Sequence, residues 1–215
     1  MLTRRHFIQT TTALFAAAAP GSLLAASRPS ASQKARWDAA VTPAGYDPAT
    51  SNPWGLNPRF LPRRVEANAG LVPGDIHVDA IARYLYHIEE GGTAMRYGVA
   101  IGRGGLYEPG TYTIRRKLEW PSWTPTPGML RREPQKYGPL RNGMPGGLSN
   151  PLGARALYLF QPGRGDTFLR VHGTNDPSTI GRAVSNGCAR LVNDQIVQFY
   201  DKVPLDTRVI LYPAT

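Results

Sequence analysis

The sequence predicts a mostly β domain with one or two short helices and a long proline-rich loop. Short runs of β-type residues separated by turn residues fill the chain after residue 70. Glycine and proline, at 23 and 20 of 215 residues, supply the turns. A content of 41 % hydrophobic and 19 % charged residues is typical of a soluble globular protein, and this length supports one domain with a tail.

The first 26 residues predict an export signal of the twin-arginine type. Arg4 and Arg5 precede Phe7 and Ile8, and an alanine-rich, weakly apolar run follows. The run 13–19 is too short to span a hydrocarbon layer of about 30 Å, which favours cleavage over the alternative of a retained anchor. We therefore expect a periplasmic protein with no stable membrane span after cleavage.

Residues 27–70 are rich in proline and polar residues and show no sustained periodicity, so they predict a linker. Trp37, Trp54 and Phe60 are the side chains by which this linker would wrap on the domain. The folded domain is expected over residues 71–213.

Strand-like runs then follow one another along the chain. They are expected at 74–80, 83–90, 94–102, 110–120, 154–160, 167–173 and 207–213. A helix is expected after residue 192, capped by Asn193 or Asp194, with Ile196, Val197, Tyr200 and Val203 on one face. The proline-rich stretch 121–151 is too long for an ordinary connection and predicts a functional loop.

The formal net charge of +10 favours a polyanionic partner: nucleic acid, an anionic membrane surface or a carboxylate-rich wall polymer. The basic residues are scattered, and no zinc-ligand set, basic helix or RNA-binding aromatic motif accompanies them. Nucleic acid also conflicts with export, so none is expected as a partner. The four histidines have no ligand spacing, and we expect no metal and no cofactor.

The single cysteine, Cys188, lies in "VSNGCARLVND". An odd thiol in an exported protein pairs between molecules, stays reactive, or is buried as a small hydrophobe. The neighbours Asn186, Gly187 and Arg190 do not resemble a core strand, which favours reactivity. A nucleophilic thiol needs a base, and His172 ends the strand-like run 16 residues earlier. The amides of Gly187 and Cys188 are then candidate donors to an oxyanion.

Here the sequence resembles a known family. "HGT" followed by "IGRAVSNGCARL" is similar to the L,D-transpeptidase catalytic domain of the YkuD type, whose signature is H-G-x-x, a spacer and S-H-G-C-x-R. "RYGVAIGRGGLYEPGTYTI", "WPSWTPTPGM" and "MPGGLSNPLGARALYLF" extend the similarity over residues 70–213. The resemblance implies a β-sandwich fold.

By this resemblance Cys188 is the nucleophile and His172 the general base, with the carbonyl of Gly173 as the third catalytic element. Ser185, Asn186, Gly187 and Arg190 fill the rest of the motif as oxyanion or substrate-binding residues. Arg190 would hold the turn or contact a substrate carboxylate. Asn186 departs from the family, which usually has a second histidine there. The loop 121–151 would form a lid, with Trp120, Trp123 and Tyr137 as walls or as core residues.

The implied reaction is acyl transfer on peptidoglycan stem peptides. Cys188 would cleave the bond between an L-diamino acid and D-alanine, and an amine of another stem, or of a wall protein, would accept the acyl group in a 3→3 cross-link. Acceptance by water would make the protein an L,D-carboxypeptidase. A third alternative is a catalytically weak peptidoglycan-binding module. A papain-like protease predicts a different sequence around the cysteine.

Overall fold

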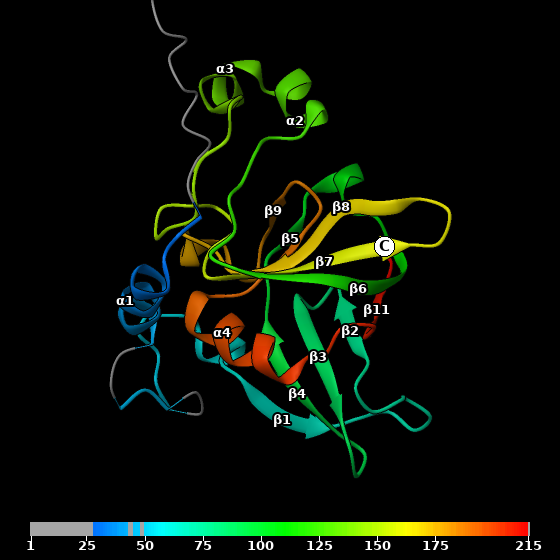
Figure 1. Cartoon of the computed structure of the whole chain (residues 1–215). Coiled ribbons are helices and arrows are strands. Elements are labelled where there is room, and N and C mark those ends of the chain that lie inside the picture. The colour runs from blue at the N-terminus through cyan, green and yellow to red at the C-terminus, as the bar shows by residue number, and fades with distance from the viewer. Residues whose placement is uncertain (1–27, 43–44, 48–49, 215) are drawn as a thin grey trace, which may run out of the picture.

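The computed structural model describes residues 28–42, 45–47 and 50–214. One long, strongly bent sheet dominates it, in the order β1-β4-β3-β2-β11-β6-β7-β8-β10 (Figure 1). Its strands are β1 (Arg63–Glu66), β2 (Ile76–Asp79), β3 (Tyr84–Glu89), β4 (Thr93–Gly98), β6 (Gly110–Glu119), β7 (Arg155–Gln161), β8 (Gly165–His172), β10 (Ala189–Arg190) and β11 (Arg208–Leu211). A parallel pair, β5 (Ile101–Gly102) and β9 (Ala183–Ser185), forms a second small sheet.

The helices are few and short. They are α1 (Ala31–Val41), α2 (Pro127–Arg132), α3 (Pro134–Tyr137) and α4 (Asn193–Lys202), with 3₁₀ turns at Pro58–Phe60, Gly104–Leu106, Gly138–Leu140 and Pro177–Thr179. The mostly β class predicted from the sequence is confirmed. Each strand-like run predicted between residues 74 and 213 contains a strand of the structure.

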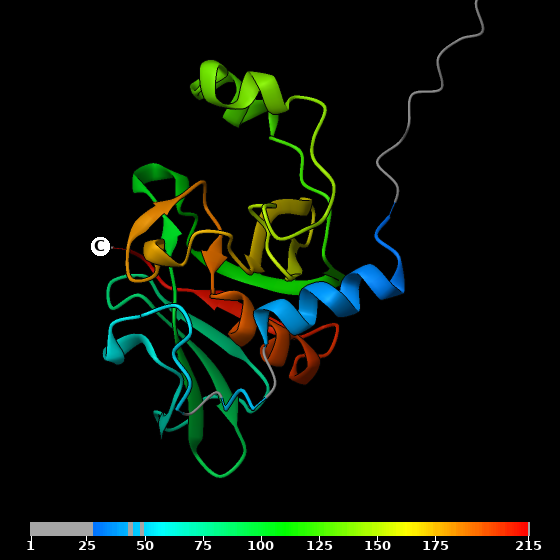
Figure 2. The same cartoon turned by 90° about the vertical axis from the view of Figure 1, so that its left-hand side faces the viewer.

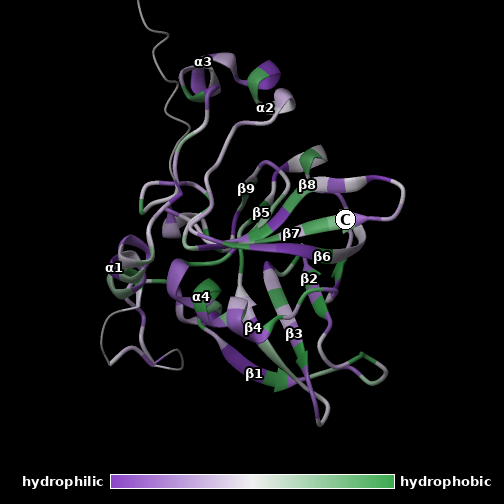
Figure 3. Cartoon of the chain, viewed as in Figure 1, coloured by the Kyte–Doolittle hydropathy of each residue, from purple (hydrophilic) through white to green (hydrophobic). Residues whose placement is uncertain are grey.

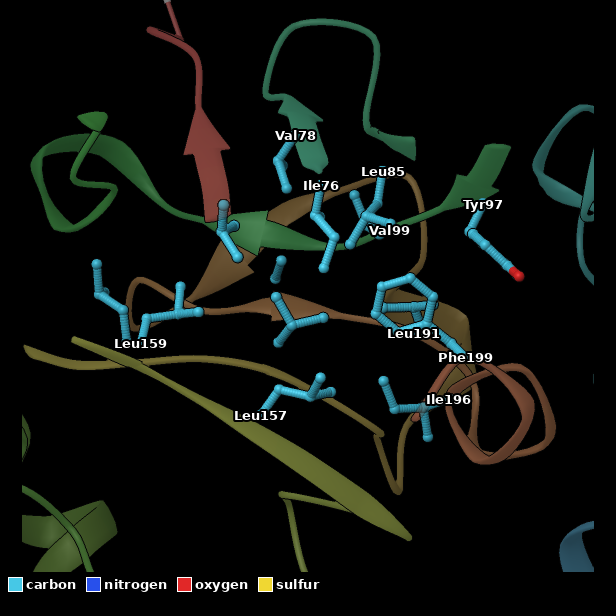
Figure 4. Close-up of a cluster of buried hydrophobic side chains, with 14 of the residues drawn as sticks. Ile76, Val78, Leu85, Tyr97, Val99, Leu157, Leu159, Leu191, Ile196 and Phe199 are labelled. Carbon is cyan, nitrogen blue, oxygen red and sulfur yellow. The ribbon is translucent and has the colours of Figure 1, made fainter. Parts of the chain in front are cut away.

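The core lies between the two halves of the bent sheet, which face each other like the layers of a sandwich (Figure 4). Ile76, Val78 and Leu85 of one half point toward Leu157 and Leu159 of β7. Helix α4 closes one end of this core with Ile196 and Phe199, and all seven side chains are at most 1 % exposed. Packing of these apolar faces is the main force that holds the two halves together.

Side-chain alternation makes the second half of the sheet two-faced. Leu169 and Val171 of β8 point into the core, and Arg170 and His172 therefore point to the opposite face. β6, with its Arg115, Arg116 and Lys117, is the most hydrophilic of the central strands, as Figure 3 shows. The polar side chains on the outer face of this half of the sheet must therefore contact solvent or line a site above the sheet.

The described part of the segment predicted to be a linker contains α1, the 3₁₀ turn at Pro58–Phe60 and β1. α1 begins with a capping box at Ser30, because Gln33 and Ser30 satisfy each other's backbone N–H groups. β1 pairs antiparallel with β4. The expected packing of Trp37, Trp54 and Phe60 on the domain is confirmed.

A partly buried ion pair connects α1 to the sheet, although the sequence of α1 is weakly amphipathic. The Asp38 carboxylate accepts two hydrogen bonds from the Arg155 guanidinium, at 2.8 and 2.9 Å. Trp120 Nε1 donates to the same carboxylate at 3.0 Å, and the Trp37 and Trp120 rings lie 5.2 Å apart. Sequence periodicity carries no signal for such a long-range pair.

Helix α4 lies where the sequence placed it, but its cap differs. The N-cap residue is Val192, and it makes no side-chain cap hydrogen bond. Asn193 is buried and its Oδ1 accepts from the Ala154 amide at 2.9 Å, while Asp194 accepts from Tyr46 and Trp54. Both residues therefore connect α4 to other segments instead of capping it.

The proline-rich segment 121–151 rises from the sheet and carries α2 and α3 (Figures 1 and 2). Figure 2 shows α1 at the base of this segment. Trp120 is 1 % exposed at that base, so it is a core residue and not a wall of the site. We call residues 121–151 the lid segment.

The expected export signal, residues 1–26, lies outside the described residues. Within the described part of the chain, no helix has the length and apolar character needed to cross a membrane.

Candidate active site

The ends of two neighbouring strands bring Cys188 and His172 to one face of the sheet. β10 pairs with β8 in parallel, with Ala189 opposite Val171 and Arg190 opposite His172. Cys188 directly precedes Ala189, so it shares a face with Arg190 and His172. One strand spacing and two residues of rise place the Cα atoms of Cys188 and His172 about 8 Å apart.

Both side chains line a cavity of about 1050 Å³ between the sheet and the lid segment. Four of the seven candidate residues line it: Cys188, His172, Asn186 and Arg190. Gly173, Ser185 and Gly187 are not among the lining residues and lie behind or beside them. Of the residues expected to bind substrate or the oxyanion, Asn186 and Arg190 therefore line the cavity, and the other three do not.

His172 is held in one tautomer. It is 3 % exposed, and its Nδ1 lies 2.6 Å from the carbonyl oxygen of Gly173. A carbonyl only accepts hydrogen bonds, so Nδ1 carries the proton and Nε2 is the unprotonated nitrogen of the neutral ring, which also lies near the backbone of Leu152. Burial, with Arg190 as the next cause, lowers the pKa of His172 to about 3. The imidazole is therefore a neutral base at physiological pH.

The Cys188 thiol is half-buried. Its Sγ lies 3.8 Å from the carbonyl oxygen of Phe168, to which it donates. Burial raises the pKa of the thiol, and the guanidinium groups of Arg170 and Arg190 lower it in part. The resting pair is consequently a neutral thiol and a neutral imidazole.

The turn before Cys188 depends on Gly187. Its φ of +124° is a backbone conformation that L side chains rarely adopt, and an added Cβ would lie 2.8 Å from Leu106 O and Leu169 Cδ2. The Gly187 amide donates to Ser185 Oγ at 3.2 Å, and Ser185 Oγ donates to the Cys188 carbonyl at 2.7 Å. The Gly187 amide therefore donates within the turn itself.

Gly173 is required by close packing. A Cβ at this position would lie 2.3 Å from Asn193 Oδ1 and 3.0 Å from the Ala154 amide. The residue after His172 must therefore be a glycine. The same close contacts hold the Gly173 carbonyl, which accepts the hydrogen bond from His172.

Asn186, at the position of the family's second histidine, connects the nucleophile turn to the lid segment. Its Nδ2 donates to the Tyr137 hydroxyl at 2.9 Å, and its Oδ1 accepts from Arg132 Nη2 at 3.2 Å. Arg103 and Glu133 form a second contact to the lid segment, at 2.9 Å. Trp123 and Tyr137, whose rings lie 6.1 Å apart, line the cavity as expected.

Sequence reasoning did not find Phe168 or Arg170. The pairing of β7 and β8 is irregular between Tyr158 and Phe160, and opposite this irregularity Phe168 has a φ of +62° and a 62 % exposed side chain. This conformation turns its carbonyl toward Cys188, and positive φ at a phenylalanine leaves no signal in sequence. The sequence does contain a signal for Arg170. It alternates with the apolar Leu169 and Val171, which places it on the same face of the strand as His172.

No metal site accompanies these residues: within 28–42, 45–47 and 50–214, no group of three or more His, Cys, Asp or Glu side chains could hold a metal ion. The cavity is instead rich in cationic side chains. They are Arg116, Arg131, Arg132, Lys136, Arg164, Arg170 and Arg190, against Glu108 and Asp176.

The fold and the cavity define a β-sheet domain with a cysteine and a histidine on adjacent strand ends beneath a lid. Residues 73–211 match the family model described as the L,D-transpeptidase catalytic domain, YkuD. The chain belongs to this family.

Relatives of known name agree with this assignment. The chain is 38 % identical over 129 residues to the probable L,D-transpeptidase ErfK/SrfK of Escherichia coli K12, covering 59 % of this chain and 40 % of the relative. It is 33 % identical over 180 residues to the probable L,D-transpeptidase YbiS of the same strain, covering 77 % and 57 %. The chain thus spans about half the length of these two relatives.

Solved structures show the same fold. A crystal structure described as a probable carnitine operon oxidoreductase from Brucella melitensis is 47 % identical, with a TM-score of 0.50 over 73 % of this chain and 96 % of that one. The Ldtfm–avibactam carbamoyl enzyme has a TM-score of 0.51 at 14 % identity, over 67 % and 51 %, and supports the fold alone.

Proposed function

We propose that the protein is a peptidoglycan L,D-transpeptidase in which Cys188 is the nucleophile and His172 the general base. The observation that carries this proposal is the fixed tautomer of His172 on the sheet face that holds Cys188. Its Nδ1 donates to Gly173 and its Nε2 is left as the proton acceptor. Family membership supports the same reaction class.

Acylation begins from the neutral pair. His172 Nε2 takes the thiol proton as Cys188 Sγ attacks the carbonyl between the L-diamino acid and D-alanine of a tetrapeptide stem. The carbonyl electron pair moves to oxygen, and the tetrahedral intermediate collapses to a thioester as D-alanine leaves with the proton from His172. Because the imidazole is buried and neutral, general-base catalysis replaces a preformed thiolate–imidazolium pair.

Deacylation reverses the roles. An amine of a second stem, or of a wall-linked protein, attacks the thioester, gives its proton to His172, and Cys188 leaves and recovers that proton. The product is a 3→3 cross-link. Attack by water would release a tripeptide instead, so the choice between transpeptidation and carboxypeptidation depends on access of the acceptor beneath the lid segment.

The Cys188 amide is the proposed oxyanion donor, since the Gly187 amide is bonded to Ser185. Asn186 positions the lid segment over the thiol through Tyr137 and Arg132. Export by the twin-arginine route to the periplasm, with cleavage near residue 26, would bring the enzyme to this substrate.

Product analysis tests the proposal. Purified protein incubated with tetrapeptide-containing wall fragments should release D-alanine and form dimers of 3→3 linkage, detected by mass spectrometry. Tripeptide without dimers identifies a carboxypeptidase. A carbapenem should acylate Cys188 in the folded protein and leave the Cys188→Ala variant unmodified; absence of both an adduct and D-alanine release would favour the binding module.

A further inference from the structure

Five of the seven cations that line the cavity have no carboxylate within 4.0 Å in the described part of the chain: Arg116, Arg131, Arg132, Lys136 and Arg190. Arg164 pairs with Glu108 at 2.6 Å and Arg170 with Asp166 at 2.7 Å. Unpaired guanidinium groups in a concave site raise the local concentration of anions and match carboxylates in geometry.

Arg116 occupies a defined place relative to Cys188. It lies opposite Tyr158 of β7, which lies opposite Arg170 of β8, and Cys188 continues this row on the next strand. Three strand spacings of about 4.8 Å separate Arg116 from Cys188, or about 14 Å between Cα atoms. The row crosses the cavity floor from the thiol to the far wall.

Stacking fixes the Arg116 guanidinium without neutralising it. Its Cζ lies 3.9 Å from the centroid of the Tyr158 ring, and the Arg170 Cζ lies 4.1 Å from the same centroid. Cation–π contact of this kind orients a guanidinium and leaves its N–H donors available. Arg116 is also exposed, so no burial prevents a ligand from reaching it.

We infer that Arg116 is a specificity-determining residue that binds a free carboxylate of the acyl-donor peptide. The Arg116 guanidinium stacks over Tyr158, which is two strand spacings, or about 10 Å, from Cys188 in this row. An extended donor with its scissile carbonyl at Cys188 advances about 3.3 Å per residue, so a side-chain carboxylate one or two residues before that carbonyl comes within reach of Arg116. Arg131, at the end of α2 on the lid segment, adds positive charge from the opposite wall. The enzyme therefore selects stem peptides with free carboxylates over their carboxamide forms. This inference deepens the proposed function and rests on it.

The test compares two tetrapeptide donors that differ only in carboxylate or carboxamide at the side positions. Wild-type protein should show a kcat/KM for D-alanine release about tenfold higher with the carboxylate donor, mainly through KM, as expected for one charged hydrogen-bonded contact. In Arg116→Gln this ratio should fall toward one. Arg115→Gln is the matched control. Arg115 directly precedes Arg116 in β6, but it pairs with Asp206 and does not line the cavity, so this variant should keep the wild-type ratio.

Equilibrium binding separates this inference from the proposed reaction. Cys188→Ala protein, which forms no thioester, should bind the carboxylate donor about tenfold more tightly than the carboxamide donor, and addition of Arg116→Gln should remove the difference. Equal binding of the two donors, or a preference that survives Arg116→Gln, would overturn the inference. Loss of D-alanine release from both donors with the binding preference intact would instead contradict the proposed function alone.

Discussion

Replacement of Asp38 by asparagine tests whether α1 is an integral part of the domain. The Asp38 carboxylate accepts from Arg155 and from Trp120, and the Arg155 side chain is only 6 % exposed. Removal of one charge from a buried pair costs about 3–5 kcal/mol, because the remaining charge is left unpaired. Asp38 itself is 29 % exposed, so water compensates in part. We expect the free energy of unfolding to fall by about 2–3 kcal/mol.

Urea denaturation followed by tryptophan fluorescence measures this loss. Asp206→Asn is the matched control, since Asp206 pairs with Arg115 at the surface with both side chains more than half exposed; it should change the free energy of unfolding by less than about 0.5 kcal/mol. Adding Arg155→Met to Asp38→Asn should recover part of the loss by removing the unpaired charge. An Asp38→Asn protein as stable as wild type would refute the docking of α1.

Three further predictions concern the nucleophile turn. Gly187→Ala should lower the free energy of unfolding by about 2 kcal/mol or more, because its φ is positive and its Cβ would contact Leu106 and Leu169; unchanged urea denaturation would contradict this. Alkylation of Cys188 by iodoacetamide should rise with pH beyond 9, since burial raises the pKa of the thiol above 9.0, and a plateau near neutral pH would indicate a thiolate–imidazolium pair instead. Asn186→Ala should speed amide hydrogen exchange over residues 127–140 about tenfold by removing two hydrogen bonds to the lid segment; exchange at the wild-type rate would disprove that contact.

The sheet and much of the site could be predicted because their signals are local. Leu169 and Val171 alternate with Arg170 and His172, and this period of two places the histidine on the face opposite the core. The glycine after His172 and the glycine before Cys188 likewise mark positions where the backbone leaves no room for a Cβ.

The remaining features depend on contacts between distant segments. α1 is stabilised by Asp38 with Arg155, a separation of 117 residues, and no window of sequence contains both. Asn193 was expected to cap α4 but accepts from Ala154. Asn186 contacts Tyr137 across 49 residues. Tertiary packing decides all three, and local propensity does not.

The central claim, that Cys188 is the acylated residue, is tested most directly by intact-protein mass spectrometry during turnover of a tetrapeptide donor. The account predicts a transient adduct with the mass of the donor minus D-alanine, located on the Cys188 peptide. The adduct should be lost in Cys188→Ala, and it should form much more slowly in His172→Gln, in which no side-chain base remains at that position. D-Alanine release by Cys188→Ala, or an adduct on any other residue, would contradict the account.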